Sequence, residues 1–340
     1  MLISLIIPVF NGEKYLNSFR SNISKIYADN RFEIIVINDG STDVFHKKLL
    51  QEFPKIKYHY QSNQGSGIAR NAGIEIATHD WIMFMDVDDE IDKQVLDIAL
   101  SFVKKPVDIY CFQAKRILHS KNIKEKLWKP EVFKHEYTGP AFGLPNIVID
   151  SIVMNKIFSR DFLLQSKVKF PKGKYEDKIF LTELFLRNPQ ICISKLCYYK
   201  WMVFPNSGSQ TNTKNVEDIN QRFDTCERQL LLAKNTPYFD IILSNIFNHD
   251  VALYSYNFKS HSNELKEKLF ERLSEFKKYK KIKQLTRHGH LIYESIDYKQ
   301  LCHTMDKIDK NKPFNIIKMD LTRYYKKLRK KLVKNYKPHP

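Results

Sequence analysis

The stretch NQGSGIARNAGIEIATHDWIMFMDVDDEI, residues 63–91, places a helix, a strand and an acidic turn one after another. After a glycine-rich start, residues 67–77 show the spacing of apolar positions that is typical of a helix. Residues 81–85, WIMFM, are short, continuous and apolar, which predicts a buried strand. The chain then turns acidic at once, with Asp86, Asp88, Asp89 and Glu90. The stretch therefore predicts a helix that leads into a core strand, with carboxylates where the strand ends.

The rest of the first hundred residues repeats this alternation of strands and helices. Amphipathic spacing predicts helices over 12–28 and 43–52. Further strands are expected at LISLIIPV (2–9), FEIIVIND (32–39), IKYHYQ (56–61) and VDIYCFQA (107–114). Strands and helices that alternate at this spacing form β-α-β units. The sequence thus predicts an α/β fold with a mainly parallel, Rossmann-like sheet.

The later sequence is less regular. We expect a helix near 147–165, another that opens at Lys174-Tyr175-Glu176-Asp177, and a strand at QICISKLCYYKWMV (190–203). From about residue 215 the pattern is helical, with few glycines and many charges. The back of the chain therefore predicts a helical extension.

Polar clusters follow three of the predicted strands. Residues 8–12 end the first strand, residues 38–43 end the second, and residues 86–89 end the fourth. Ligands bind beyond the carboxyl ends of the strands in such a sheet. Three polar clusters at one edge indicate a single binding site.

Asp86 and Asp88 are two residues apart in extended or turning chain. At this spacing both carboxylates can reach one octahedral ion and leave positions for water and phosphate oxygens. Mg²⁺ and Mn²⁺ prefer such oxygen ligands, shared with a substrate diphosphate. The alternative is a solvated loop whose acids cap the next helix, as Asp89, Glu90 and Asp92 could do.

Three other candidates each have a structural alternative. Asp39 could hydrogen-bond a base or ribose, although its turn also suits a helix cap with Gly40 at positive φ. Arg70 could supply a cation to a nucleotide, or its glycine-rich loop could only allow close packing. Glu176 and Asp177 could include a general base, or could only complement a helix dipole. The residues alone leave these alternatives open.

The chain has 340 residues and a net charge of +18, and this charge is unevenly distributed. Residues 1–100 hold 10 basic and 14 acidic side chains, whereas residues 101–340 hold 46 basic and 24 acidic ones. The back of the chain is therefore expected to face an anionic partner. The 5 cysteines show no C-x-x-C pair, no apolar run could span a bilayer, and no signal peptide is visible, so we expect a reduced, cytoplasmic location.

The last residues form a basic, amphipathic segment. Over 321–338 the chain has basic side chains and no acid, while apolar residues recur at three- or four-residue steps over 314–332. This pattern predicts a helix on an anionic membrane surface. The alternative is a helix that packs its apolar stripe on the body of the protein. No recognition motif supports a nucleic-acid partner.

Taken together, the motifs resemble those of family 2 glycosyltransferases, which have the GT-A fold. They are "SLIIPVFNGEKYL", "EIIVINDGSTD", the stretch 63–91, "MNKIFSR" and "YEDKIF". The resemblance is close over residues 1 to about 115 and weaker to about 210. It implies a GT-A catalytic domain over 1–210, with a nucleotide-binding half (1–115) and an acceptor and base half (116–210). A helical C-terminal domain (215–310) and the basic tail (314–340) would follow.

The resemblance also implies roles for individual residues. Asp39 would hydrogen-bond uracil, and Arg70 would contact the nucleotide. Asp86 would lie near ribose and metal, and Asp88 would bind the Mn²⁺ or Mg²⁺ that bridges the two phosphates. The nucleoside pocket would be lined by Pro8, Phe10 and Asn11, with Glu13 nearby. Asp177 would be the catalytic base, supported by Glu176, while Ser207 and Ser209 would help to close the donor site, next to a Lys200 that stands where arginine is frequent.

The implied activity is metal-dependent sugar transfer with inversion, from a nucleotide sugar to a hydroxyl group. The donor would be a UDP-hexose or UDP-N-acetylhexosamine. The acceptor would be a glycan or lipid-linked glycan in surface polysaccharide synthesis, met by a peripheral protein on the inner face of the cell membrane. The alternative is a noncatalytic protein that keeps the fold and binds glycan or membrane.

Overall fold

The computed structural model describes residues 1–101, 106–119, 123–204, 215–255, 258–276, 278–279, 282, 285–295 and 297–310. The chain divides into two compact units. The first consists of residues 1–141 and 150–208, and the second of residues 142–149 and 209–340. The segment 142–149 thus groups with the helical part of the chain, although it lies inside the range that we expected for the acceptor and base half.

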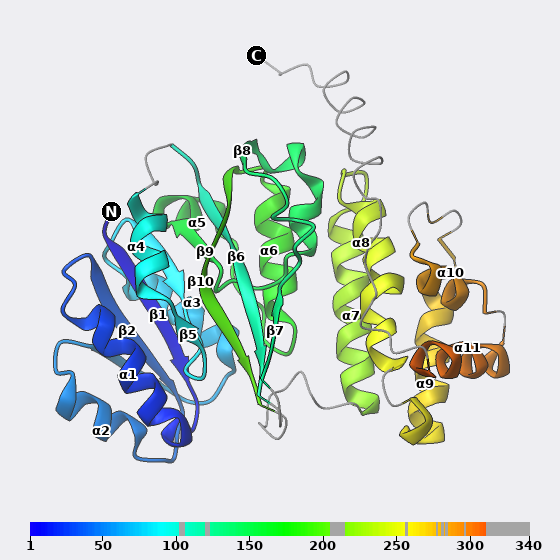
Figure 1. Ribbon diagram of the computed structural model, residues 1–340, viewed down its shortest axis with the longest axis horizontal. Coiled ribbons are helices and arrows are strands. Elements are labelled where there is room, and N and C mark those ends of the chain that lie inside the picture. Colours follow the sequence, from blue (N-terminus) through cyan, green and yellow to red (C-terminus); the bar gives the residue numbers. More distant parts are fainter. Residues whose placement is uncertain are drawn as a thin grey trace. The chain divides into compact units, whose positions relative to one another are not determined.

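The first unit is built on one large sheet (Figure 1). Its main path runs in the order β3-β2-β1-β4-β9-β6-β10-β5. The first four of these strands are parallel to one another: β1 (Ile3–Val9), β2 (Phe32–Asp39), β3 (Lys57–Gln61) and β4 (Trp81–Phe84). The prediction of a mainly parallel α/β sheet is confirmed, and its strand boundaries agree to within a residue in this half.

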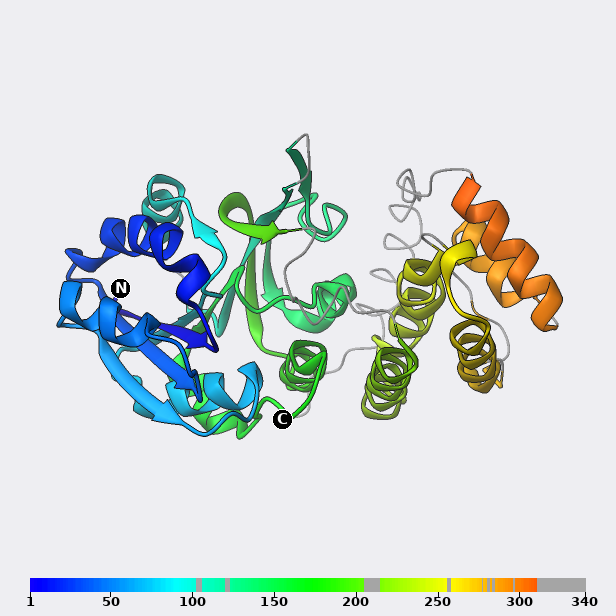
Figure 2. The same ribbon diagram turned by 90° about the horizontal axis from the view of Figure 1, so that it is seen from below.

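The helices of this half lie on both faces of the sheet. After η1 (Glu13–Tyr15) come α1 (Leu16–Tyr27), α2 (Phe45–Glu52), α3 (Ser66–Ile76) and α4 (Lys93–Ser101). The crossovers through α1 and α2 step outward from β1 to β3, whereas the crossover through α3 returns to β4. Because such crossovers are right-handed, α3 lies on the face opposite α1 (Figures 1 and 2). At Gly73, α3 comes so close to β1 that an added Cβ would lie 2.3 Å from Cγ2 of Ile6.

The second half of the sheet is mixed. Strands β6 (Ile109–Leu118) and β10 (Gln190–Val203) are parallel, while β9 (Lys156–Ser159) runs antiparallel to both β4 and β6. Three shorter strands pair antiparallel at its margins: β5 (Glu90–Ile91), β7 (Lys124–Leu127) and β8 (Tyr137–Pro140). Strand β9 therefore joins the two halves into one sheet.

The prediction of a helix near 147–165 is wrong. The segment contains a short 3-10 helix η3 (Pro145–Ile149), the strand β9, and only then the helix α5 (Arg160–Ser166). A buried ion pair accounts for the difference, because the fully buried Lys156 ammonium lies 2.7 Å from Oδ2 of Asp150 and 2.6 Å from the carbonyl of Ile152. Buried charges need such partners, which here require a turned chain instead of a continuous helix.

An aromatic cluster joins β4 and β9 to helix α6 (Glu176–Leu186). Phe84 and Phe158 meet edge to face, with ring centroids 5.7 Å apart. Phe170 packs edge to face on Phe84 and stacks on Phe180 of α6 at 3.7 Å. Such contacts fix the position of the N-terminus of α6 against the strand that ends in the acidic turn.

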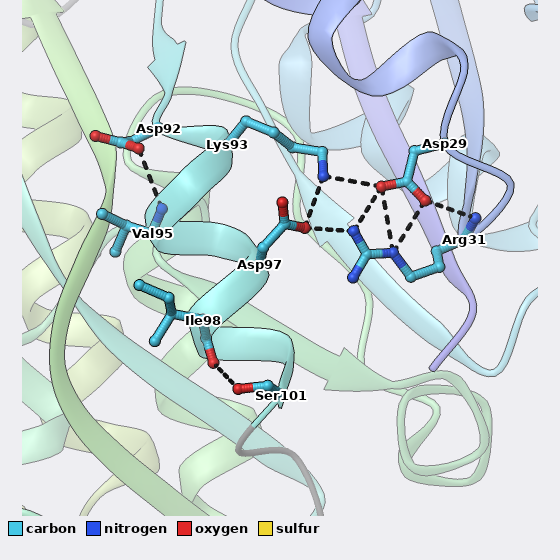
Figure 3. A network of polar contacts seen from close by, with 8 residues as sticks. All are labelled: Asp29, Arg31, Asp92, Lys93, Val95, Asp97, Ile98 and Ser101. Atoms are coloured by element: carbon cyan, nitrogen blue, oxygen red, sulfur yellow. Dashed lines mark hydrogen bonds and ion pairs between the residues drawn. The ribbon is translucent and has the colours of Figure 1, made fainter.

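A polar network at the surface ties α4 to the turn between α1 and β2 (Figure 3). The Lys93 ammonium lies 2.9 Å from Asp29 and 2.6 Å from Asp97, and Arg31 contacts both carboxylates. The hydrogen bonds from Arg31 are the largest reason why the pKa of Asp29 lies well below its usual value. These acids serve the fold and lie apart from the strand-end clusters.

The second unit is helical, as predicted. Its described elements are η3, α7 (Val216–Leu232), α8 (Phe239–Asn245), a π-helix (Ile246–Asp250), two short 3-10 helices (Ala252–Ser255 and Phe258–Ser260), α9 (Asn263–Phe276), α10 (Arg287–Tyr293) and α11 (Tyr298–Lys310). Arg222 and Asp250 form a buried ion pair at 3.3 Å inside it. Among the described residues, no helix is both long and apolar enough to cross a bilayer. The predicted basic tail, 314–340, lies outside the described residues.

Candidate active site

The loops after β1 and β2 are bound to each other. The backbone N–H of Asn11 donates to Oγ of Ser41 at 3.0 Å, and the N–H of Thr42 donates to Oδ1 of Asn11 at 2.9 Å. Asn11 has φ 49°, a left-handed conformation that asparagine tolerates better than most residues. The two predicted strand-end clusters therefore form one continuous rim.

The other residues predicted for the nucleoside pocket differ in exposure. Phe10 presents a ring that is 53% exposed at the end of β1, whereas Pro8 is buried within that strand. Glu13 lies at the surface, where the Lys48 ammonium is 2.6 Å from its Oε1. Phe10 and Asn11 are thus placed to meet a ligand, while Pro8 supports the strand beneath them.

Asp39 accepts hydrogen bonds from its own chain at both carboxylate oxygens. Oδ1 accepts from Nε2 of Gln61 at 2.7 Å and from the N–H of Gln64 at 2.9 Å, and Oδ2 accepts from the N–H of Gly65 at 2.8 Å. The residue is 3% exposed. Asp39 therefore holds the loop before α3, a contribution that the sequence did not reveal, and one acceptor position on Oδ2 remains for a ligand.

Arg70 is the centre of the site. Its Nη1 donates to Oε1 of Glu176 at 2.9 Å and to Oδ1 of Asp177 at 3.0 Å, and its Nη2 donates to Oδ1 of Asp86 at 2.8 Å. Burial alone would lower the pKa of Arg70, and the three carboxylates together raise it above its ordinary value. The guanidinium is 3% exposed, so its described contacts are to protein carboxylates, and a nucleotide contact for Arg70 stays a prediction.

Two local features bring Glu176 and Asp177 to Arg70. Asn71, next to Arg70 on α3, exchanges two 2.9 Å hydrogen bonds with the backbone of Phe170 and so holds the segment that leads to α6. Gly67 then allows the close approach, because a Cβ there would lie 2.8 Å from Cγ of Glu176. The side chains of Glu176 and Asp177, which include the predicted base, thus face α3.

Glu176 and Asp177 differ in environment. Glu176 also accepts from Oγ of Ser66 at 2.5 Å. Burial raises the pKa of Asp177 to about 7, while the charge of Arg70 opposes the rise and that of Glu176 adds to it. A carboxylate with a pKa near neutrality is suited to accept a proton under physiological conditions.

Asp88 lies near Asp86, the carboxylate that accepts from Nη2 of Arg70. Burial raises the pKa of Asp88 to about 6, with a further contribution from the negative charge of Asp86 and an opposing one from Lys14. Three carboxylates, those of Asp86, Glu176 and Asp177, thus meet one guanidinium, and the carboxylate of Asp88 adds a fourth negative charge beside Asp86. This excess of negative charge on oxygen ligands fits a hard divalent cation such as Mn²⁺ or Mg²⁺.

A metal ion would not be enclosed by protein ligands alone. Within the described parts of the chain, no group of three or more histidine, cysteine, aspartate or glutamate side chains is arranged to hold an ion. Asp86 and Asp88 offer two carboxylates, which matches an ion that takes its remaining ligands from water and phosphate. The residues present fit a shared site of this kind.

Asp89 contributes to the structure in a way that the sequence analysis did not predict. It was expected to lead into the next helix, but it is 4% exposed and accepts from the hydroxyl of Tyr199 and, at 2.7 Å, from the N–H of Met202. The cap of α4 is instead Asp92, whose Oδ1 accepts from the N–H of Val95 at 3.1 Å. Asp89 therefore binds the acidic turn to β10.

Tyr199 was missed as a residue of this region. Its hydroxyl also accepts from the N–H of Asp86 at 3.3 Å, so it touches both ends of the acidic turn. The signal in the sequence was the position of Tyr199 in a buried strand, where a tyrosine hydroxyl needs a partner. Lys200, the next residue, pairs with Glu90 at 3.5 Å. Ser207 and Ser209 lie outside the described residues.

Comparisons with known proteins agree with this architecture. Residues 4–165 match the family model described as Glycosyl transferase family 2. An uncharacterized glycosyltransferase of Escherichia coli K12, YibD, is 26% identical over 257 residues, which cover 71% of this chain and 73% of YibD. The chain is also 25% identical over 209 residues to TarS of Staphylococcus aureus, a poly(ribitol-phosphate) beta-N-acetylglucosaminyltransferase, of whose length the match covers 35%.

Solved structures share the fold. The crystal structure of S. aureus TarS 1–349 in complex with UDP-GlcNAc has a TM-score of 0.68, 20% identity and coverage of 92% of each chain. A mannosyltransferase of Pyrobaculum calidifontis, PcManGT, in complex with GDP-Man and Mn²⁺, has a TM-score of 0.51 and 13% identity. At these identities the likeness shows the fold alone, which is the expected GT-A fold.

Asp88→Asn should stabilise the metal-free protein at neutral pH. The folded pKa of Asp88, about 6, lies above the ordinary value of 3.8, so the cost of its charge grows as the pH rises from 4 to 6 and is complete above 6. In EDTA at pH 7.5 we expect a gain of about 1–3 kcal/mol in the free energy of unfolding, which shrinks toward pH 4. Urea titrations at both pH values measure it.

The matched control is Asp80→Asn, at an exposed aspartate just before β4, which should change stability little at either pH. Adding Mn²⁺ should stabilise the wild type more than Asp88→Asn. A gain that is the same at pH 7.5 and pH 4, or an equal effect of Mn²⁺ on both proteins, would contradict this account of Asp88.

Proposed function

Because this chain is a family 2 glycosyltransferase with a GT-A fold, we propose that it moves a sugar from a UDP-sugar to a hydroxyl group of a glycan or lipid-linked glycan, with inversion and with a divalent metal ion. Membership of this family favours an enzyme over a noncatalytic binding protein.

One observation supports the proposal most strongly. Arg70 holds Asp86, at the end of β4, together with Asp177, at the start of α6. A transfer with inversion needs a cation site at the leaving group and a proton acceptor on the other side of the reacting carbon. One buried guanidinium that contacts acids from both places is the arrangement expected for such a site.

On the donor side, the rim of Phe10 and Asn11 would line the nucleoside pocket, and the remaining acceptor position of Asp39 would meet uracil. The complex of TarS with UDP-GlcNAc supports a UDP-sugar such as UDP-N-acetylhexosamine or UDP-hexose as the donor. Mn²⁺ or Mg²⁺ held by Asp86 and Asp88 would offset the negative charge that develops on the departing diphosphate. The Mn²⁺ in PcManGT is a precedent in the same fold.

On the acceptor side, Asp177 would act as the general base. An acceptor hydroxyl is a weak nucleophile, and its proton would pass to a carboxylate oxygen of Asp177 while the acceptor oxygen bonds to the anomeric carbon and the diphosphate leaves. Attack on the face opposite the leaving group inverts the configuration. Glu176 accepts hydrogen bonds from Ser66 and Arg70. It would position Asp177 and keep the Arg70 guanidinium in place.

The charge of the chain and the relatives support the proposed acceptor and place of action. TarS acts on poly(ribitol-phosphate), a polymer, which supports a glycan-type acceptor. We propose that the basic segment 314–340 attaches the protein to the inner face of the cell membrane, where lipid-linked acceptors of surface polysaccharide synthesis are found. A peripheral protein of the cytoplasm is consistent with the charge of the chain.

Asp177→Asn should abolish most of the turnover. Loss of a general base costs about 10²–10⁴-fold in rate. UDP release from a panel of UDP-sugars with Mn²⁺, with water as the acceptor where none is supplied, measures the effect. For the wild type, kcat should rise between pH 6 and pH 8, because the proton must leave a carboxyl group whose pKa is about 7.

Asp161→Asn, at an exposed acid in the first turn of α5, is the matched control and should keep the wild-type rate. Turnover of Asp177→Asn within tenfold of the wild type would rule out Asp177 as the base. So would a product that retains the anomeric configuration of the donor, as read by NMR.

The membrane proposal predicts charge-dependent binding by the tail. Replacement of Lys326, Lys327, Lys330 and Lys331 by glutamine should weaken flotation with phosphatidylserine vesicles, because each basic side chain near an anionic surface contributes about 1 kcal/mol. Vesicles of phosphatidylcholine alone are the control and should bind both proteins weakly. Equal flotation of both proteins with anionic vesicles would favour a tail that packs on the body.

A further inference from the structure

Three strands at the far side of the sheet present one row of side chains on a shared face. The register places Trp201 of β10 opposite Arg116 of β6, and Arg116 opposite Lys126 of β7. Residues directly opposite one another point to the same face of a sheet. Tyr199, two residues before Trp201, also points to this face. Arg116 and Trp201 therefore lie one row beyond the tyrosine that contacts the acidic turn.

Arg116 is a half-buried cation without an acidic partner in the described part of the chain. Its Nε is buried and lacks a hydrogen-bond acceptor. Burial lowers the pKa of Arg116 from its ordinary value, and no carboxylate opposes the shift. The segments that continue β6 and β10, SKN (120–122) and PNSGSQTNTK (205–214), contain no acid either. A guanidinium that has lost part of its hydration without a counterion is a site for an external anion.

One tryptophan ring lies against this cation, and a second packs on the first. The Arg116 guanidinium lies 5.2 Å from the Trp201 ring, and Trp128 meets Trp201 edge to face at 5.2 Å. Trp128 is fixed from its polar end, because its Nε1 donates to Oδ1 of Asp150 at 2.8 Å. Asp150 is itself neutralised by the buried Lys156, so it is no counterion for Arg116. Both indole rings are half-buried, and they form a rigid apolar wall beside the charge.

The row of Trp201, Arg116 and Lys126 is close to the acidic turn and to the proposed general base. The hydroxyl of Tyr199 bonds to Asp89 and to the backbone of Asp86. On the other side, the charge of Lys156 acts on Asp177 and lowers its pKa, so the network beneath Trp128 is within electrostatic range of the proposed base. Arg116 and its tryptophans are thus linked to the acidic turn through Tyr199, and to the surroundings of the proposed base through Asp150 and Lys156.

We propose that Arg116, with the rings of Trp201 and Trp128 beside it, forms a subsite for an anionic group, a phosphate or a carboxylate, on the glycan acceptor. The inference rests on the proposed function, because it names the class of acceptor. An aromatic wall suits the apolar face of a sugar or polyol, and the guanidinium fork suits the planar or tetrahedral oxygens of the anion.

The position of the row favours the acceptor over the donor diphosphate. The donor cation site lies at the end of β4, and the nucleoside rim lies at the ends of β1 and β2. In the sheet, β9 stands between β4 and β6, and β10 lies beyond β6. The subsite is therefore displaced from the nucleotide toward the half of the sheet that leads to α6.

The test measures anion binding by tryptophan fluorescence. The chain has 3 tryptophans, so in a Trp81→Phe background the signal comes from Trp128 and Trp201. The full-length protein is titrated with inorganic phosphate, glycerol phosphate and glucuronate, and with neutral glucose, first without and then with saturating UDP and Mn²⁺. The anions should change the fluorescence, and Arg116→Gln should weaken their binding by about tenfold or more, as expected for loss of a charge-assisted pair. The anion that binds most tightly identifies the source.

The matched control is Lys115→Gln, which removes the same charge from the neighbouring residue of the strand, on the opposite face, and should leave anion binding unchanged. Equal binding by wild type and Arg116→Gln overturns the inference, as does an equal loss in both variants. Loss of the Arg116-dependent signal when UDP and Mn²⁺ are added would assign the subsite to the donor and also overturn it. UDP binding by the wild type is measured separately, and its absence would count against the proposed function instead.

Discussion

The Arg70 guanidinium joins the end of one strand to the start of a helix about 90 residues further along the chain. It donates to Asp86, which ends the fourth strand, and to Glu176 and Asp177, which begin α6. A lysine would replace it poorly, because a guanidinium presents two separate nitrogens in fixed directions whereas an ammonium is a single compact charge. The aromatic stacking of Phe170 on Phe180 and the amide of Asn71 then hold α6 where the guanidinium can reach it. The geometry of the site therefore depends on this one side chain.

Burial is the main cause of the raised pKa values of Asp88 and Asp177, and the excess of negative charge around Arg70 underlies the proposed need for a metal ion. One buried cation faces three carboxylates, and Asp88 lies beside one of them, so part of this negative charge is left uncompensated. Burial of unpaired charge costs several kcal/mol for each ion. Sites that keep such a cost commonly use it, because the ligand that relieves it binds more tightly. The same reasoning applies at Arg116, where the unbalanced charge is positive and the expected ligand is an anion.

The sequence predicted the nucleotide-binding half well because its signals are local. Continuous apolar runs and the helices between them define β1 to β4, and the polar clusters mark the ends of the strands. The acidic turn was located correctly, but its members were not separated: Asp89 binds Tyr199 and Met202, whereas Asp86 accepts a hydrogen bond from Arg70 and Asp88 lies beside Asp86. That distinction depends on β10, which lies more than a hundred residues later. The strand β9 was mistaken for a helix for the same reason, since the buried pair of Asp150 and Lys156 overrides the local pattern.

The most direct measurement is the titration of the Asp177 carboxyl by carbon-13 NMR in the wild type and in Arg70→Gln, assigned by its absence in Asp177→Asn. In the wild type Asp177 should titrate near pH 7. Since the charge of Arg70 lowers the pKa of Asp177, its removal should raise that pKa well above the wild-type value. If Asp177 titrates at the same pH in both proteins, Arg70 does not hold the two sides of the site together, and this account of the site is wrong.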